Sequence, residues 1–335
     1  MRKLATIRRI SKIHPIPDAE NIELAIIDGW QVVVKKHEFR PGDLGIYCEI
    51  DSFLPMTDQF EFLSSRGLQT IANGTQGHRL KTAKLCGQIS QGLFIPIPFI
   101  IPDNISKIEG FDCTEVLGIQ LYEPKIPAEL NGEVKGPLPS FIQKTDEERI
   151  QNHPDYFERW AGHKFTVTEK LDGTSFTAYL NKGKFGVCGR NYEFNLDTQK
   201  KNTYLQVAKS LDLERRLRVL GKNIAIQGEL IGEGIQKNRY KIKGHAVRFF
   251  TVFDIDKRRP MSPNATLKFL KNIDLKPVPV IKNGLEFSFN IDSILSYAEG
   301  KSELSDSTRE GLVFRHTDDS RISFKVISNK FLLNE

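Results

Sequence analysis

The sequence contains few cysteines and no long apolar segment. Its four cysteines, Cys48, Cys86, Cys113 and Cys188, stand far apart, and no CxxC or HxxxH spacing occurs. Structural zinc sites need closely spaced ligand pairs, so none is expected, and isolated thiols fit the reducing interior of a cell. No apolar run approaches 18 residues, so no transmembrane helix is predicted. We therefore expect an intracellular, soluble protein that does not bind membranes.

Basic residues outnumber acidic ones only in the second part of the chain. The 335 residues carry a net charge of +6, of which residues 1–122 contribute −1 and residues 123–335 contribute +7. A polyanionic partner would therefore find most of its counter-charge in the second part. A solvated surface that is mildly rich in lysine explains the same numbers, so charge alone does not identify a partner.

Residues 123–140 form the boundary between two expected domains. This segment holds four prolines and two glycines without helical or strand periodicity, which is typical of a linker. Before it, residues 1–122 contain several short strand-like runs separated by turn sequences such as Asp28-Gly29. Short strands at this spacing, in a domain of this size, predict a small β-barrel. The second domain then comprises residues 141–335.

The second domain is expected to be α+β and mainly antiparallel. Residues 145–148 resemble a capping box that opens a helix containing Arg149. Leucines at helical spacing indicate a second helical zone near residues 202–220. The other segments that carry candidate site residues read as strands, at residues 165–171, 174–180, 184–191, 223–232, 246–256, 310–316 and 321–327. Residues 171–174 read as the turn of a hairpin between the first two. Polar groups from separate strands are thereby expected to meet.

Five charged side chains lie within or beside runs that otherwise favour burial: Lys170, Asp172, Glu229, Glu310 and Lys325. A lone lysine of this kind is usually part of an exposed ion pair. Charges on several such strands are costly, however, unless they share a site. Carboxylates can hold a hydrated Mg²⁺ while cations neutralise phosphate oxygens. A lysine amine in such a site can act as a nucleophile toward the α-phosphorus of a nucleoside triphosphate.

The order of these groups resembles that of a known superfamily. Residues 170–173, KLDG, resemble the nucleotidyl-lysine motif of the covalent nucleotidyltransferases, which comprise DNA ligases, RNA ligases and capping enzymes. The later motifs of that superfamily have counterparts in GRN at 189–191, GEL at 228–230, FDI at 253–255, EGLVF at 310–314 and SFKV at 323–326. The ordered set spans the second domain from Arg149 to Lys330.

Details of these motifs resemble RNA ligases more than the other two classes. DNA ligases and capping enzymes usually carry an arginine two residues after the glycine of the first motif, whereas this chain has Ser175. Similarity to RNA ligases extends to GELIGEGIQKN at 228–238 and SNKF at 328–331. The first domain resembles the N-terminal OB module of the fifth family of ATP-dependent RNA ligases at residues 12–30, 42–55 and 80–97.

This resemblance implies a fold and a nucleophile. The expected fold is an N-terminal OB-type β-barrel followed by a mainly antiparallel nucleotidyltransferase domain with flanking helices. Lys170 is implied to be the nucleophile that becomes linked to AMP from ATP. Thr168 and Glu169 would border the adenine, and Phe253 would stack on it. Core packing explains Phe253 about equally well, because it ends an apolar run.

The resemblance also implies which groups hold the ribose, the metal and the phosphates. Asp172, Glu229 and Glu310 would fix the ribose and a hydrated Mg²⁺ or Mn²⁺. Arg190 and Lys325 would contact the ribose or the α-phosphate. All five are charged, as a site for a nucleotide and its metal requires.

Two further residues belong to the implied ATP- and AMP-binding set. Arg149 would meet the outgoing pyrophosphate, although a solvated helix position explains it as well, and Gly173 completes the first motif. The last motif departs from the family pattern, which often has two lysines at alternate positions, because Ile327 follows Lys325. Either Lys330 supplies the missing charge, or the α-phosphate is held with one lysine fewer.

The implied function is an ATP-dependent RNA ligase that joins 3′-OH and 5′-phosphate ends through a lysyl-AMP intermediate. Its expected partner is RNA with such ends in a nicked duplex, and its expected role is RNA repair as a monomer. A DNA ligase or capping guanylyltransferase is an alternative enzyme. A non-catalytic OB-fold RNA-binding protein is the other alternative, against which the intact set of Lys170, Asp172, Glu229 and Glu310 argues.

Overall fold

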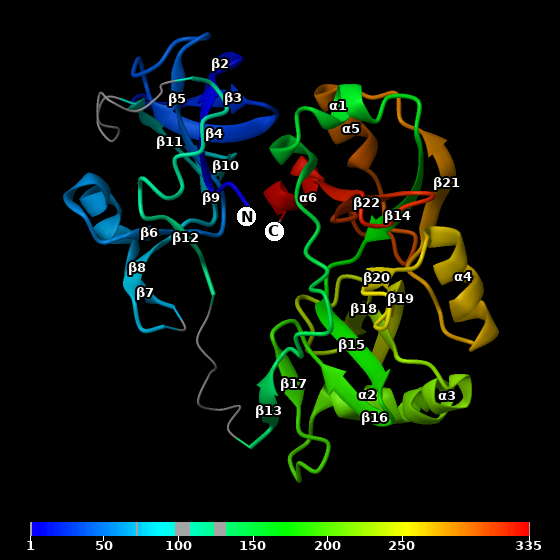
Figure 1. Cartoon of the computed structure of the whole chain (residues 1–335). Coiled ribbons are helices and arrows are strands. Elements are labelled where there is room, and N and C mark those ends of the chain that lie inside the picture. Colours follow the sequence, from blue (N-terminus) through cyan, green and yellow to red (C-terminus); the bar gives the residue numbers. More distant parts are fainter. Residues whose placement is uncertain (1, 72, 98–107, 124–131, 335) are drawn as a thin grey trace. The chain divides into compact units, whose positions relative to one another are not determined.

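A computed structural model describes residues 2–71, 73–97, 108–123 and 132–334 of the chain (Figure 1). The chain divides into two compact units, Met1–Pro127 and Ala128–Glu335. Each unit has hydrophobic clusters built from its own residues. Among the described residues, no helix combines the length and apolar character needed to cross a membrane.

The first unit consists of short antiparallel strands. They pair in the orders β1-β5-β11, β2-β3-β4, β10-β9 and β12-β6-β8-β7. Their bounds are β1 Ala5–Arg9, β2 Lys12–Pro15, β3 Ile22–Ile27, β4 Trp30–Lys35, β5 Leu44–Cys48, β6 Ser52–Pro55, β7 Gln69–Thr70, β8 Gln76–Arg79, β9 Thr82–Leu85, β10 Gln88–Gln91, β11 Leu93–Pro96 and β12 Gln120–Leu121, with a 3₁₀ helix over Asp58–Arg66. In the described part of this unit the ladders stay separate and do not close into one continuous barrel.

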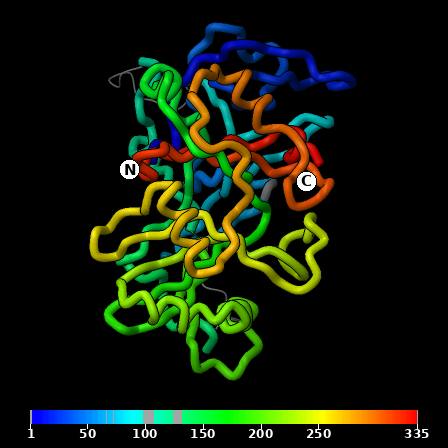
Figure 2. Tube along the Cα trace, turned by 90° about the vertical axis from the view of Figure 1, so that its right-hand side faces the viewer, coloured from blue at the N-terminus to red at the C-terminus, as the bar shows by residue number. Residues whose placement is uncertain are grey.

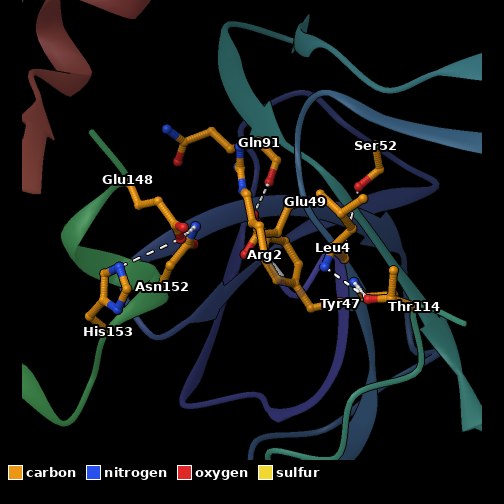
Figure 3. Close-up of polar contacts among 11 residues, drawn as sticks. Arg2, Leu4, Tyr47, Glu49, Ser52, Gln91, Thr114, Glu148, Asn152 and His153 are labelled. Carbon is orange, nitrogen blue, oxygen red and sulfur yellow. Dashed lines mark hydrogen bonds and ion pairs between the residues drawn. The ribbon is translucent and has the colours of Figure 1, made fainter. Parts of the chain in front are cut away.

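Tight turns and side-chain hydrogen bonds stabilise the fold of the first unit. Asp28 and Gly29 both have positive φ, 47° and 79°, as a two-residue hairpin turn between β3 and β4 requires. The beginning of the chain is bound to distant segments, as Figure 3 shows. The Leu4 amide donates to Thr114 Oγ1 over 2.9 Å, and Ser52 Oγ donates to the Leu4 carbonyl oxygen over 3.2 Å. The first bond gives the buried Leu4 amide a partner, and the second adds to the bond that the Leu4 carbonyl accepts from the Glu49 amide.

The second unit contains two antiparallel sheets. One has seven strands in the order β13-β17-β16-β15-β18-β19-β20, and the other has four in the order β21-β14-β22-β23. Their bounds are β13 Val134–Pro137, β14 Lys164–Lys170, β15 Thr174–Asn181, β16 Lys184–Cys188, β17 Tyr192–Phe194, β18 Ile224–Gly232, β19 His245–Asp254, β20 Arg259–Pro260, β21 Val280–Glu286, β22 Gly311–His316 and β23 Ser323–Ile327. The second unit is therefore α+β and mainly antiparallel, as predicted.

Helices cover the two sheets and complete their cores. They are η4 Ile150–Asn152, α1 Tyr156–Arg159, α2 Thr203–Ser210, α3 Leu213–Leu220, α4 Pro263–Asn272, α5 Ile291–Ala298 and α6 Asn329–Asn334. Apolar residues of α2, α3 and α4 pack on the seven-stranded sheet, while α5 packs on the four-stranded one. Helix α5 begins with a capping box in which Asn290 and Ser293 bond each other's backbone. The helical zone predicted near residues 202–220 is confirmed as α2 and α3.

Two local predictions are wrong. Residues 171–174 do not turn a hairpin, because β14 pairs with β21 and β22 whereas β15 pairs with β16 and β18. The chain crosses there from one sheet to the other. Residues 145–148 do not open a helix: Arg149 forms a parallel bridge with Lys325, and the Lys325 amide donates to the Glu148 carbonyl over 2.8 Å. This tertiary pairing outweighs the local capping pattern.

The predicted linker is only partly a connecting segment. Within residues 123–140, Val134–Pro137 form β13 and pair with β17. Residues 124–131 lie outside the described part of the chain. Proline and glycine are tolerated in β13 because it is an edge strand. The second unit therefore begins earlier than residue 141.

Candidate active site

One cavity gathers most of the predicted site residues. It has a volume of about 390 Å³ and lies in the second unit. Nine of the eleven residues predicted to bind ATP or AMP line it: Thr168, Glu169, Lys170, Asp172, Gly173, Arg190, Glu229, Glu310 and Lys325. Arg149 and Phe253 do not line it. Residues that are far apart in the sequence are thus brought to a single polar pocket.

The crossing between the two sheets creates this meeting point. Strand β14 ends at Lys170, which pairs with Gly311 at the beginning of β22, so Glu310 lies beside it. In the other sheet, Glu229 of β18 pairs with Ser175 near the beginning of β15. Because residues 171–173 connect β14 to β15, the lysine and both carboxylates reach the same cavity.

Gly173 allows the crossing segment to lie against β18. A Cβ atom at this position would come within 2.5 Å of the Leu230 carbonyl oxygen and 2.8 Å of Glu229 Cγ. Any side chain would therefore push the segment away from the strand that carries Glu229. The glycine of the first motif is explained by this close approach.

Lys170 forms an ion pair with Glu310. Its Nζ lies 2.7 Å from Glu310 Oε1. Burial works to lower the pKa of Lys170, but the Glu310 and Glu229 carboxylates outweigh it and hold that pKa above its ordinary value. Burial raises the pKa of Glu310, while Lys170 opposes the rise. The amine is therefore protonated at neutral pH before a nucleotide binds.

Two other groups of the cavity titrate near pH 8. Burial raises the pKa of Glu229 to about 8, and the opposing effect of Lys170 is too small to prevent it. Burial lowers the pKa of Lys325 to about 8, and the positive charges of Lys170 and Arg149 lower it further. The Arg190 side chain is more exposed than those of Glu229 and Lys325, and its Nη2 lies 3.2 Å from Asp146 Oδ1. The cavity thus contains cations and carboxylates that only partly neutralise one another.

Buried acceptor atoms at the cavity are left without protein partners. Glu169 accepts a hydrogen bond from the Glu303 amide at Oε2 over 2.8 Å, but its Oε1 has no hydrogen-bond partner among the described residues. Glu310 Oε2 is likewise buried without a partner in the described part of the chain. Unsatisfied buried acceptors are costly, and both line the cavity. They are therefore candidates for ligand contacts.

The predicted three-carboxylate metal site is not preassembled. Among the described residues, no group of three or more histidine, cysteine, aspartate or glutamate side chains is placed to hold a metal ion. Asp172 Oδ2 instead accepts from Arg239 Nε over 3.1 Å, and Glu310 pairs with Lys170. A hydrated Mg²⁺-type ion needs only one or two carboxylates together with substrate phosphates, so the donors present still fit such an ion.

Phe250, rather than Phe253, is the aromatic residue of the cavity. Phe253 packs in a separate cluster with Tyr179 and Ala225, whereas Phe250 lines the cavity. A β-bulge explains the difference, because Gln227 and Gly228 of β18 pair with Thr251 and Phe249 and leave Phe250 as the extra residue. The bulge breaks the alternation of β19, which the sequence pattern alone does not reveal.

Two basic residues considered for the site, Arg149 and Lys330, lie outside the cavity lining. Arg149 is a buried residue that stands before η4 and contributes to the low pKa of Lys325, but it lies outside the cavity lining. Lys330 Nζ pairs with Glu299 over 2.6 Å and does not line the cavity either. The structure therefore gives no support to Lys330 as a replacement for the lysine absent at Ile327.

Arg315 is a site residue that the sequence reasoning missed. It is buried, lines the cavity and forms an ion pair with Glu147. Its guanidinium carbon lies 5.3 Å from the centre of the Phe250 ring, and its Nη1 donates to Thr168 Oγ1 over 3.4 Å. A basic residue inside the buried strand EGLVFRH was the available indication.

Comparisons with known proteins give consistent results. A model of the RNA ligase family matches residues 163–327, and a model described as an OB-fold domain matches residues 4–97. The comparison with curated proteins gives no match. Solved structures of Naegleria gruberi RNA ligase are similar over the whole chain and 42% identical in sequence.

Three of these structures illustrate the similarity. A variant of the Naegleria gruberi enzyme in its apo form has a TM-score of 0.84, covering 100% of this chain and 98% of that chain. A variant with ATP and Mn also has a TM-score of 0.84, covering 99% of each chain. The enzyme with PPi has a TM-score of 0.83, covering 100% and 99%. The chain therefore belongs to the RNA ligase family and is an ATP-dependent RNA ligase with an N-terminal OB-fold domain.

Proposed function

We propose that this ligase seals 3′-OH and 5′-phosphate RNA ends through AMP bound to Lys170. The observation that carries the proposal is the single cavity in which Lys170 lies with eight other predicted nucleotide-binding residues. In the first step Nζ attacks the α-phosphorus of ATP, so that a P–N bond forms and the bond to pyrophosphate breaks. AMP then passes to the RNA 5′-phosphate, and attack by the 3′-OH releases AMP.

The proton on Lys170 must leave before the amine can attack. Glu310 Oε1, 2.7 Å from Nζ, is the nearest acceptor that the structure offers. A divalent cation supplies positive charge that favours the neutral amine and stabilises the phosphate oxygens. Lys325 and Arg190 then hold phosphate oxygens in line with Nζ, since most of the catalysis in phosphoryl transfer is positioning and charge neutralisation.

We assign the base and metal contacts from the same cavity. Glu169 Oε1, which lacks a protein partner among the described residues, suits the amino group of adenine, and Thr168 borders the base. Phe250 takes the stacking role predicted for Phe253. Asp172, Glu229 and Glu310 are proposed to hold the ribose and a hydrated Mg²⁺ or Mn²⁺. The structure of a Naegleria gruberi RNA ligase variant with ATP and Mn supports the choice of a divalent cation.

The substrate is proposed to be a nicked RNA duplex, sealed by a monomer in RNA repair. One chain contains every group assigned above, which supports activity as a monomer. An OB-fold domain offers strands and loops suited to nucleic acid, and we assign residues 1–122 to the placement of the RNA end. Arg149 is assigned to the outgoing pyrophosphate through its place beside Lys325.

The test uses ATP labelled at the α-phosphate. The wild-type protein is expected to become labelled with Mn²⁺ or Mg²⁺ and to pass the label to an RNA 5′-phosphate in a nicked duplex. Glu310→Ala should reduce labelling by roughly 100-fold or more, because the acceptor of the Lys170 proton and a proposed contact to the metal are lost together. A protein that prefers GTP, or that seals DNA 3′-OH ends as well as RNA ends, would contradict the proposal.

A further inference from the structure

The connection between β18 and β19 is fixed to the segment that follows the nucleophile. This connection, residues 233–244, is here called the anchored loop, and Figure 2 draws it in yellow-green as a loop that stands out from its unit. Arg239 Nε donates to Asp172 Oδ2 over 3.1 Å, and the Asp172 amide donates to Tyr240 OH over 2.6 Å. Gln236 Nε2 donates to the Gly173 carbonyl over 3.1 Å. The loop therefore cannot move independently of residues 172 and 173.

Bonds within the anchored loop hold its shape. The Asn238 side chain donates to the Ile242 carbonyl over 3.0 Å and accepts from the Ile242 amide over 3.1 Å. Gln236, Asn238 and Lys241 all have positive φ, at 46°, 41° and 52°. Non-glycine residues adopt this conformation at a cost, so three of them in one loop point to a constrained backbone.

The anchored loop also concentrates positive charge. Between Glu233 and His245 the chain carries Lys237, Arg239, Lys241 and Lys243 and no further acid. Lys241 and Lys243 are exposed, and among the described residues neither has a side-chain ion pair or hydrogen bond. Neither lysine lines the cavity, so neither is placed to contact ATP there. A rigid loop with two unpaired lysines beside the site is suited to an anion outside the nucleotide pocket.

We propose that Lys241 and Lys243 bind backbone phosphates of the RNA next to the end that reacts. The proposal rests on the proposed function, in which an RNA end must reach Lys170. Six acidic side chains line the cavity, and those that are ionised repel that polyanion: Asp146, Glu147, Glu169, Asp172, Glu229 and Glu310. Lysines on a loop bound to residues 172 and 173 offset this repulsion at the place where the RNA enters. Phosphate contacts of this kind fix the register of a nucleic acid without reading its sequence.

The proposal separates two steps of the reaction. Lysyl-AMP formation involves ATP alone, so it should not depend on lysines outside the nucleotide pocket. Transfer of AMP to RNA and sealing require bound RNA, so both should depend on them. An ordinary solvated loop would affect neither step. Loss of the loop's fold would instead disturb Asp172 and Gly173 and would affect the first step as well.

The test combines Lys241→Asn with Lys243→Gln in the full-length protein. Asparagine suits the positive φ at position 241, so the charge is removed while the backbone is preserved. Lysyl-AMP formation should stay within about twofold of wild type, since no cavity residue changes. The adenylylated variant should bind a nicked RNA duplex roughly tenfold more weakly than the adenylylated wild type. A plot of the logarithm of the RNA association constant against the logarithm of salt concentration should have a slope smaller in magnitude by about 1.5.

Two matched variants complete the experiment. Lys268→Gln with Lys271→Gln removes the same charge from exposed positions of α4 and should leave RNA binding unchanged. Lys241→Arg with Lys243→Arg should restore it, because the charge returns. If the variant Lys241→Asn with Lys243→Gln keeps the wild-type RNA affinity and salt dependence, the assignment of these lysines to RNA phosphates is wrong. The assignment is also wrong if the α4 variant loses as much RNA affinity as the loop variant. Failure of the wild-type protein to form lysyl-AMP would instead contradict the proposed function itself.

Discussion

The two lysines of the cavity differ in how firmly they hold their protons. Lys325 has a pKa lowered to about 8 by burial and by neighbouring cations, whereas Glu310 and Glu229 hold the pKa of Lys170 above its ordinary value. In the ligand-free protein Lys325 is therefore the more readily deprotonated amine. The choice of Lys170 as nucleophile must come from its position and from the charges that ATP and its metal bring.

Glu229 predicts a measurable dependence of stability on pH. Its pKa is about 8 in the folded protein, against an ordinary value of 4.5, so the folded state retains a proton that the unfolded state has lost. This stabilisation is complete below about pH 4.5 and disappears as pH rises through about 8. Urea unfolding at pH 5 and pH 8.5 should show wild type losing at least about 1 kcal/mol more than Glu229→Gln. Parallel losses in the two proteins would mean that Glu229 ionises normally.

The two phenylalanines of β19 should respond differently to truncation. Phe250→Ala should raise the KM for ATP in lysyl-AMP formation roughly tenfold, because stacking on the base is lost, with a small effect on unfolding. Phe253→Ala should lower the free energy of unfolding by about 3 kcal/mol or more, because the ring is buried in the core. Its folded fraction should keep a near-normal KM. The reverse pattern would return the stacking role to Phe253.

At this scale the sequence identified the charged residues better than the aromatic ones. A charged residue within an apolar strand stands out in the sequence, because burying a charge is costly unless the residue belongs to a site. Phe250 was missed because a β-bulge changes which residues of β19 face the cavity, and a bulge depends on the partner strand. Arg315 was missed because its partner Glu147 lies far away in the sequence.

At the scale of elements, the crossing between β14 and β15 brings the site together. Gly173→Ala should reduce lysyl-AMP formation and lower the free energy of unfolding by about 1–3 kcal/mol, because the new Cβ would meet the Leu230 backbone. Gly136→Ala is a suitable control, because a Cβ there would have no atom within 4 Å. Enzyme assays and urea unfolding of both variants make the comparison. Equal behaviour of the two would show that the close approach is unimportant.

Strand positions were more predictable than strand partners. Alternating and apolar runs identified β14, β15, β18, β19, β22 and β23 correctly. Pairing depends on contacts between distant residues, so the hairpin predicted at 171–174 proved to be a crossing between sheets. The capping pattern at 145–148 failed for the same reason, since the bridge between Arg149 and Lys325 holds that segment extended.

At the scale of the whole molecule, the two units suggest a division of labour. The nucleotide-binding cavity lies entirely in the second unit, and each unit has its own hydrophobic clusters. A fragment of residues 123–335 should therefore form lysyl-AMP but fail to seal a nicked RNA duplex. Both activities are to be measured on one soluble, folded preparation. Retention of both, or loss of both, would contradict the assignment of RNA placement to residues 1–122.

The most direct test of the account is to locate the AMP on the protein. Wild-type protein is incubated with ATP and Mn²⁺, digested at neutral pH and analysed by mass spectrometry. The account predicts AMP on Lys170, none in Lys170→Arg, and a slower but intact modification in Lys325→Arg, since Lys325 is assigned to the phosphate. AMP on Lys325, the amine with the lower pKa, or an adduct that survives Lys170→Arg would contradict the central claim.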